Sequence, residues 1–286
     1  MLNATKILTI KPIIMKPQLF LYFLAIALFL SCKKENDDGT EPPGSGTKLT
    51  KMVIVTGFTT TTTNLTYDAG GKLARWHETE TGGGSSAEDG FRIQRKADGM
   101  IDKIVFKRDG ISDSITVAVN SSGSKYTSAQ STQSFSGMTH TVSTTFLYDN
   151  AGNITESTET DIYANDPPDP KSRVNYTYVN GNITSMKVYR ISGGTNDLFM
   201  QHDLEHDQKL NPLAFGAEWI VFTSTGMLFG PHGSANNFTR LTIKRPGAGE
   251  IPITASYTYN DKNMPVTAVQ KNAAGQVVAT TTFTYQ

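Results

Sequence analysis

The sequence is poor in the residues that would point to redox, metal or nucleic-acid chemistry. It contains a single cysteine, Cys32, so it can form no intrachain disulfide and no thiolate metal cluster. Its 26 basic residues are matched by 26 acidic ones, which leaves no positive excess for a nucleic-acid partner. These absences argue against a disulfide-stabilised protein and against a nucleic-acid-binding protein.

Catalytic signatures are equally scarce. The chain has no Gly-x-Ser-x-Gly nucleophile turn and no phosphate-binding glycine loop. Sustained helical periodicity is also missing, and only Glu218–Phe229 could hold one short helix. We therefore expect a non-enzymatic, all-β protein with no cofactor.

The N-terminus has the parts of an export signal. Residues 1–18 carry Lys6, Lys11 and Lys16 and no acid, and residues 19–30 are uninterruptedly apolar. This apolar stretch is shorter than the roughly 20 residues that a spanning helix needs. We interpret residues 1–31 as a signal peptide and expect the true start at Met15, which opens a compact positively charged segment.

The residues around the cysteine resemble the lipobox of bacterial lipoproteins. The segment Leu28–Cys32 reads Leu-Phe-Leu-Ser-Cys, with Phe29 where that family prefers leucine. The resemblance implies that Cys32 becomes the lipid-bearing first residue of the mature chain, held at the outer membrane. The alternative is an ordinary free thiol.

We interpret residues 32–48 as a lipidated start followed by a disordered tether. The residues after Cys32 lack apolar side chains large enough to bury. The acidic residues soon after Cys32 resemble the surface-export signal of Bacteroidota lipoproteins. A merely soluble linker is the alternative, so the choice between the periplasmic and the surface-exposed face stays open.

Residues 49–286 repeat a unit of about 28 residues and are expected to form a single β domain. The clearest copies contain an apolar-x-Tyr segment followed by an Asp- and Gly-containing turn, as in Leu65–Leu73 and Phe146–Ile154, and weaker copies keep the register without the tyrosine. The equivalent positions are Tyr67, Arg95, Val119, Tyr148, Tyr178, His206, Tyr259 and Tyr285. The double gap before Tyr259 predicts a further degenerate unit near Phe229–Gly233.

Two strands per unit predict an antiparallel meander of about 16 strands. Such a sheet has an aromatic face and a Thr/Ser-rich face, and the chain offers no helices to cover the aromatic one. We therefore expect the sheet to curl, aromatic side inward, into a barrel or half-barrel. A membrane-spanning barrel would need apolar residues outside, which charged strands such as Arg92–Lys96 disfavour.

The repeat resembles the tyrosine-aspartate repeats of bacterial surface and toxin-shell proteins. Together with the lipobox it makes the chain similar to a Bacteroidota lipoprotein family of unknown function with a porin-like β fold. The segments Asp207–Pro212 and Ser234–Asn237 are also typical of that family. The resemblance implies a fold and a location, and no activity.

Several residues remain as candidate sites. The segment His202–His206 matches the H-x-x-E-H zinc pattern, but on a strand its histidines would lie roughly 13 Å apart, so we expect no metal. Ser114, in Asp113-Ser114-Ile115, resembles an O-glycosylation site of Bacteroidota exported proteins. Trp76 and Trp219 would form a sugar-stacking platform if exposed, and core residues if buried.

Three functional hypotheses follow. The first is a lipid-anchored, non-enzymatic protein whose β domain binds or scaffolds a partner at the membrane. The second is a carrier that holds a lipophilic molecule in an apolar lumen. The third is a glycan-binding surface lipoprotein.

Overall fold

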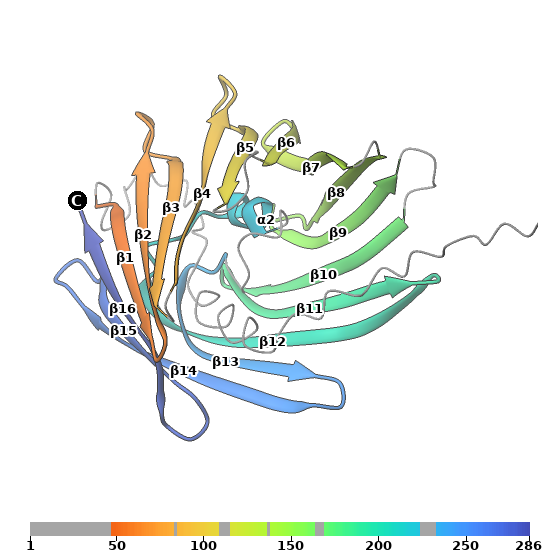
Figure 1. Cartoon of the computed structure of the whole chain (residues 1–286). Coiled ribbons are helices and arrows are strands. Elements are labelled where there is room, and N and C mark those ends of the chain that lie inside the picture. The colour runs from red at the N-terminus through yellow and green to blue at the C-terminus, as the bar shows by residue number, and fades with distance from the viewer. Residues whose placement is uncertain (1–46, 83–84, 109–114, 136–137, 164–168, 224–232) are drawn as a thin grey trace, which may run out of the picture.

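The protein is a closed antiparallel β-barrel (Figure 1). The computed structural model describes residues 47–82, 85–108, 115–135, 138–163, 169–223 and 233–286. Within these ranges sixteen strands follow one another around the ring, and β1 pairs with β16 to close it. The predicted all-β meander is confirmed, and the alternative between half-barrel and barrel resolves in favour of a barrel.

The strands alternate with short connections around the ring. Their bounds are β1 Leu49–Thr56, β2 Thr59–Tyr67, β3 Leu73–Gly82, β4 Ser85–Arg95, β5 Ile101–Arg108, β6 Ile115–Ser122, β7 Lys125–Phe135, β8 Met138–Tyr148, β9 Ile154–Tyr163, β10 Asp169–Val179, β11 Asn182–Ser192, β12 Thr195–Leu210, β13 Asn236–Arg245, β14 Gly249–Tyr259, β15 Pro265–Lys271 and β16 Val277–Tyr285. One helix, α2 (Ala217–Thr223), accompanies them in the described part of the chain.

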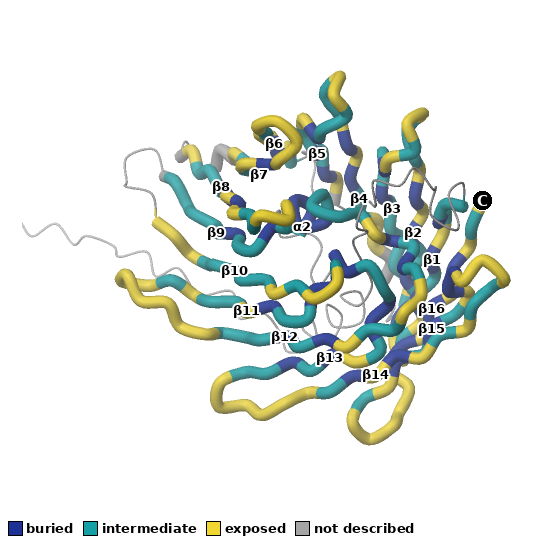
Figure 2. The backbone as a smooth tube through the Cα atoms, turned by 180° about the vertical axis from the view of Figure 1, so that it is seen from behind, coloured by how far each residue is buried: buried dark blue, intermediate teal, exposed yellow. Residues whose placement is uncertain are grey.

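The strands have the two-residue alternation of a sheet with different faces. In β16, Ala279, Thr281 and Phe283 are buried while the threonines between them are exposed. Alternate side chains of a strand point to opposite faces, so this pattern assigns the buried set to the inside. Figure 2 shows the same alternation around the ring, with exposure greatest along the hairpins β11–β12 and β13–β14.

The repeat has a structural counterpart at one end of the barrel, here called the tyrosine end, where the even-numbered strands finish. At all eight repeat positions, or one to two residues beyond, the pairing with the next strand shifts register, for example between Thr66 and Tyr67 and between Leu147 and Tyr148. Such a β-bulge bends its strand and increases the local twist. A bulge in each unit therefore curls the sheet toward closure.

The turns at this end use the predicted Asp and Gly residues. The Asp68 carboxylate accepts the Lys72 amide at 2.9 Å, and the Asp149 carboxylate accepts the Asn153 amide at 2.9 Å. Asp149 also accepts the backbone amide of Ala151, two residues on, and in the turn after Arg95 the Asp98 carboxylate accepts the Met100 amide, again two residues on, at 2.9 Å, as in an Asx turn. Gly71 and Gly152 adopt φ values of 80° and 85°, which non-glycine residues rarely reach.

The repeated tyrosines fasten neighbouring strands. Tyr67 donates its hydroxyl to the Leu49 carbonyl at 2.7 Å, and Tyr285 donates to the Pro265 carbonyl at 2.7 Å. Tyr148 and Tyr257 make the equivalent bond to the strand before their own, at 2.9 and 3.0 Å. Each bond ties the end of an even strand to the start of the odd strand before it, so these tyrosines have a packing role.

The double gap in the repeat is not another strand pair. β12 pairs directly with β13, so no further strand pair stands between them in the ring and the predicted degenerate unit is wrong; Phe229–His232 themselves lie outside the described residues. The 25 residues between Leu210 and Asn236 instead form a connection, and its α2 helix lies within the ring of strands (Figure 1). The helix falls inside the predicted segment Glu218–Phe229 except for its first residue, Ala217.

The two ends of the described chain meet at the tyrosine end. Lys48 and Gln286 exchange backbone hydrogen bonds of 3.1 and 3.0 Å, which extend the β1–β16 ladder. All sixteen strand pairings lie within Leu49–Tyr285, so the barrel is complete without residues 1–46. The leader, Cys32 and Ser114 lie outside the described residues.

None of the helices among the described residues is long and apolar enough to cross a membrane.

Removing one tyrosine hydroxyl should loosen the tyrosine end. We expect Tyr67→Phe to lower the free energy of unfolding by about 1 kcal/mol, because the ring stays and one hydrogen bond to the Leu49 carbonyl is lost. Urea denaturation followed by circular dichroism measures this loss. Tyr189→Phe is the matched control, since Tyr189 contacts Arg173 through its ring face. Equal losses in the two variants would contradict the role given to the hydroxyl.

Candidate functional site in the barrel interior

Helix α2 closes part of the interior with an aromatic cluster. Trp219 packs against Trp76 of β3 with ring centroids 5.9 Å apart, and Phe222 packs against Phe91 of β4 at 5.3 Å. Trp76 is 3% exposed and Trp219 is 2% exposed. The structure therefore assigns both tryptophans to the core between helix and wall, and not to a sugar-stacking surface.

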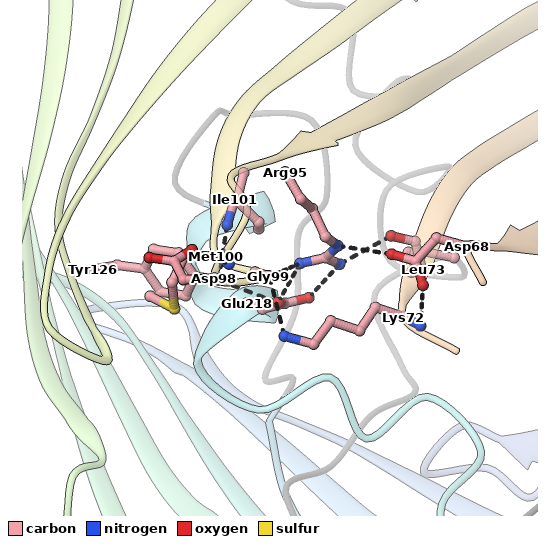
Figure 3. A network of polar contacts seen from close by, with 10 residues as sticks. All are labelled: Asp68, Lys72, Leu73, Arg95, Asp98, Gly99, Met100, Ile101, Tyr126 and Glu218. Atoms are coloured by element: carbon pink, nitrogen blue, oxygen red, sulfur yellow. Dashed lines mark hydrogen bonds and ion pairs between the residues drawn. The ribbon is translucent and has the colours of Figure 1, made fainter. Parts of the chain in front are cut away.

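A buried ion pair fixes the helix to the wall (Figure 3). Arg95, at the end of β4, donates two hydrogen bonds to the Glu218 carboxylate, at 2.6 and 2.9 Å. The same guanidinium reaches the Leu73 carbonyl at 2.9 Å and forms an ion pair with Asp68 at 3.4 Å. Burial acts to lower the pKa of Arg95, but the bonds and charge of Glu218 outweigh it and raise that pKa.

The Glu218 carboxylate also accepts a hydrogen bond from Tyr126 of β7 at 3.1 Å. It is thus held by two strands that lie three places apart in the ring. Arg95 occupies a position that five of the eight repeat units fill with tyrosine, and here the side chain at this position holds the helix. A two-donor arginine–carboxylate contact fixes orientation as well as distance.

The connection that carries α2 is fastened where it leaves and rejoins the barrel. Asn182 and Asn236 bond to each other at 3.0 and 2.9 Å, and the Ser234 hydroxyl accepts the Ile183 amide at 2.9 Å. At the other side the Asn237 side chain donates to the Leu210 carbonyl at 3.2 Å. These contacts lie in the segments Asp207–Pro212 and Ser234–Asn237 and hold both ends of the connection.

The inner wall away from the helix is polar. The hydroxyl of Thr63 donates to Glu78 at 3.0 Å, and that of Thr61 reaches Glu80 at 3.5 Å, both between β2 and β3. Burial is the main cause that raises the pKa of Glu78, and the nearby charges of Asp89 and Glu80 raise it further. The expectation of a wholly aromatic inner face is therefore correct only near the tyrosine end.

Two further inward side chains are buried without hydrogen-bond partners. Gln270 of β15 is 0% exposed and Thr281 of β16 is 1% exposed, and their side-chain polar atoms meet no partner. The strand register places both beside Ala268 and Ala279. A buried polar group without a partner costs roughly 1–3 kcal/mol, which makes this part of the wall suited to a bound polar group or water.

The third unusual group is His202 of β12. It is 6% exposed, and neither ring nitrogen has a hydrogen-bond partner. Burial, and second the charge of Arg245, lower its pKa from 6.5 to about 4, so the ring is neutral at pH 7. Burial is likewise the main cause that lowers the pKa of His206 to about 4.

The predicted zinc pattern has the strand geometry that disfavours metal binding. His202 and His206 lie four residues apart on β12, with a register shift before His206. Within the residues the structure describes, no three His, Cys, Asp or Glu side chains are grouped as a metal site requires. The Asp149 carboxylate, in one of the Asp- and Gly-containing turns, is used within that turn, because it accepts hydrogen bonds from the backbone and side chain of Asn153.

Sequence reasoning missed the polar interior. The sequence predicts a Thr/Ser-rich outer face, yet Thr61 and Thr63 point inward and are at most 3% exposed. Counting along β3 from the buried Trp76 would have placed Glu78 and Glu80 on the same face. No comparable signal singles out Gln270 or His202 in the sequence.

Comparison with known proteins bears on the fold. No family model matches the chain, and no curated protein is significantly similar to it. A porin-like protein from Bacteroides uniformis ATCC 8492 is similar in structure, with a TM-score of 0.54, 15% identity, and coverage of 83% of this chain and 98% of that one. A second, from Bacteroides vulgatus ATCC 8482, has a TM-score of 0.50 at 14% identity and covers 84% and 99%. The fold is a porin-like barrel.

Breaking the Arg95–Glu218 pair should be costly. We expect Glu218→Ala to lower the free energy of unfolding by about 3–5 kcal/mol, because Arg95 would keep a buried charge without its main partner. Adding Arg95→Met should recover part of the loss. The exposed Glu205 pairs with Arg240 at 3.8 Å on the outer face, so Glu205→Gln should cost less than about 0.5 kcal/mol. Chemical denaturation of the wild type and the three variants measures these costs, and similar costs for both glutamates would contradict the assignment.

His202 should make stability depend on pH. The unfolded chain takes up a proton near pH 6.5 and the folded chain only near pH 4, so His202 lowers stability as the pH falls from 6.5 to 4. Between those limits the wild type should lose up to about 3 kcal/mol relative to His202→Leu. Urea titrations at several pH values measure the difference. Parallel pH profiles would refute it, and His77→Leu on the outer face is the control.

Proposed function

We propose that the protein is a non-enzymatic lipoprotein, anchored at the outer membrane through Cys32, whose barrel stands in water and binds a ligand on its inner wall. The observation that carries this proposal is the polarity of the outer face. Cross-strand ion pairs lie there, including Lys244 with Asp203 at 3.1 Å and with Glu250 at 3.3 Å. A spanning barrel instead presents a tall apolar band to lipid.

Hydrogen-bonded pairs of threonines also make the outer face of the barrel polar. Thr258 and Thr267 are hydrogen-bonded at 2.6 Å, and Thr132 and Thr141 at 2.9 Å, all on the outside of neighbouring strands. Charged side chains cost about 2–4 kcal/mol each on the lipid face of a barrel near the bilayer centre. The outer surface therefore favours an aqueous environment, with the membrane contact supplied by the lipid anchor.

The position of the termini supports a defined orientation. The chain enters the barrel at Lys48, at the tyrosine end and beside Gln286. A short tether from Cys32 would keep this end toward the membrane and turn the opposite end, with the hairpins β11–β12 and β13–β14, away from it. Ligands would then approach from the side that faces away.

Of the three functional hypotheses, glycan binding loses its motivation because Trp76 and Trp219 are both in the core. One observation supports the hypothesis of a lipophilic carrier. Ile251 lies opposite Ile243 in the strand register, so it points inward, and it is 44% exposed. An apolar inner surface that water can reach is a reason to consider an apolar ligand.

Cell fractionation of two chains tests the proposal. The full chain should be found in the outer-membrane fraction, released by detergent and not by carbonate. The same chain with residues 1–32 replaced by a cleavable secretory signal should be soluble in the periplasm without detergent, because its outer face is polar. Retention of this second chain in the membrane after a carbonate wash would mean that the barrel itself inserts. Recovery of the full chain in the soluble fraction would exclude the anchor.

A further inference from the structure

The inner wall around His202 differs from the rest of the interior in its chemistry. His202 lies opposite Met186 of β11 and Ile243 of β13 in the strand ladders. Its own neighbour two residues along β12 is Met200, which lies opposite Val188. A neutral imidazole is therefore set into a surface of methionine and branched aliphatic side chains.

A positive charge borders this surface. Arg245 follows Ile243 by two residues on β13 and so lies on the same face, diagonal to His202. Diagonal neighbours on one face of a sheet lie roughly 7–8 Å apart, which long side chains can bridge. The charge of Arg245 acts on His202 directly, since it contributes to keeping that ring neutral.

The surface becomes accessible toward the end of the barrel opposite the tyrosines. His202 and Ile243 are 6% and 2% exposed, Arg245 and Met200 are partly exposed, and Ile251 is 44% exposed. An elongated molecule could therefore enter from that end with its polar group beside Arg245. Its apolar part would lie along Met200 and Ile251.

His202 indicates what that polar group should be. Both of its ring nitrogens are buried without partners, although a neutral imidazole offers one donor and one acceptor. A group that accepts hydrogen bonds and carries negative charge would satisfy the donor and also complement the arginine. A carboxylate meets both conditions, and its planar pair of oxygens matches the guanidinium fork.

We propose that this wall binds the carboxylate of an apolar chain, a ligand of the fatty-acid class, with Arg245 and His202 as its polar contacts. The inference rests on the proposed ligand-binding function and narrows it to one ligand chemistry. The hydrocarbon chain would cover the apolar wall formed by Met186, Val188, Met200 and Ile251. No covalent step is involved.

Calorimetry on residues 33–286, which contain every strand of the barrel, tests the proposal. Dodecanoate, 1-dodecanol and dodecylammonium are titrated below their micellar concentrations. We expect dodecanoate to bind with at least about tenfold higher affinity than the alcohol and the amine, because only the carboxylate pairs with Arg245. Arg245→Gln and His202→Leu should each weaken dodecanoate at least about tenfold and leave dodecanol unchanged.

A second measurement separates contact from folding effects. In nuclear magnetic resonance spectra with labelled histidine, dodecanoate should shift the His202 ring signals and leave those of His77 on the outer face in place. His77→Leu is the matched variant and should bind dodecanoate as the wild type does. Arg245→Gln, at the partly exposed end of the wall, keeps the test available if His202→Leu does not fold.

The outcomes are separable from those of the fractionation experiment. Equal affinity for all three ligands, or unchanged dodecanoate binding in Arg245→Gln, would overturn the carboxylate site. Absence of binding by any of the three ligands would overturn the carboxylate site as well. Recovery of the unanchored barrel from the periplasm without detergent would still support an anchored protein whose barrel is surrounded by water. Membrane insertion of the barrel would instead remove the proposed function itself.

Discussion

Closure of the sheet is the constraint on which the other features depend. Once β1 pairs with β16, the strands have no free edge, and every side chain must point either into the ring or out of it. Seven residue pairs join these two strands, which come from opposite ends of the described chain. The bulge found in every repeat unit supplies the curvature that lets the last strand meet the first.

A ring of this many strands encloses more space than its own side chains can fill. The protein meets this need with the connection between β12 and β13, which folds inward and brings α2 against the aromatic residues of β3 and β4. The helix is short, so its packing contacts alone fix its orientation weakly. The ion pair between Arg95 and Glu218 also fixes the orientation of the helix relative to the barrel wall. The remaining interior is divided between a polar wall at β2–β3 and an apolar one at β11–β14.

Much of the fold could be predicted from the sequence, because the tyrosine repeat reports strand ends directly. Tyr67 and its equivalents mark one position per strand pair, and counting them yields the number of strands. The long connection could not be predicted, since its length equals about one repeat and imitates a missing unit. The chemistry of the interior was harder to predict. Strand alternation from Trp76 places Glu78 on the inner face, but composition alone assigns polar residues such as Glu78 and His202 to the outside.

The hydrogen bonds between Lys48 and Gln286 have a topological consequence. Because the first and last strands are neighbours in the ring, the barrel has no structurally distinct beginning. A circular permutant that joined these two residues and opened the glycine turn at Gly193–Gly194 would retain all sixteen strand pairings. The strands follow one another around the ring in sequence order, so moving the point at which the chain is opened changes which strand is synthesised first and leaves the neighbours of every strand unchanged.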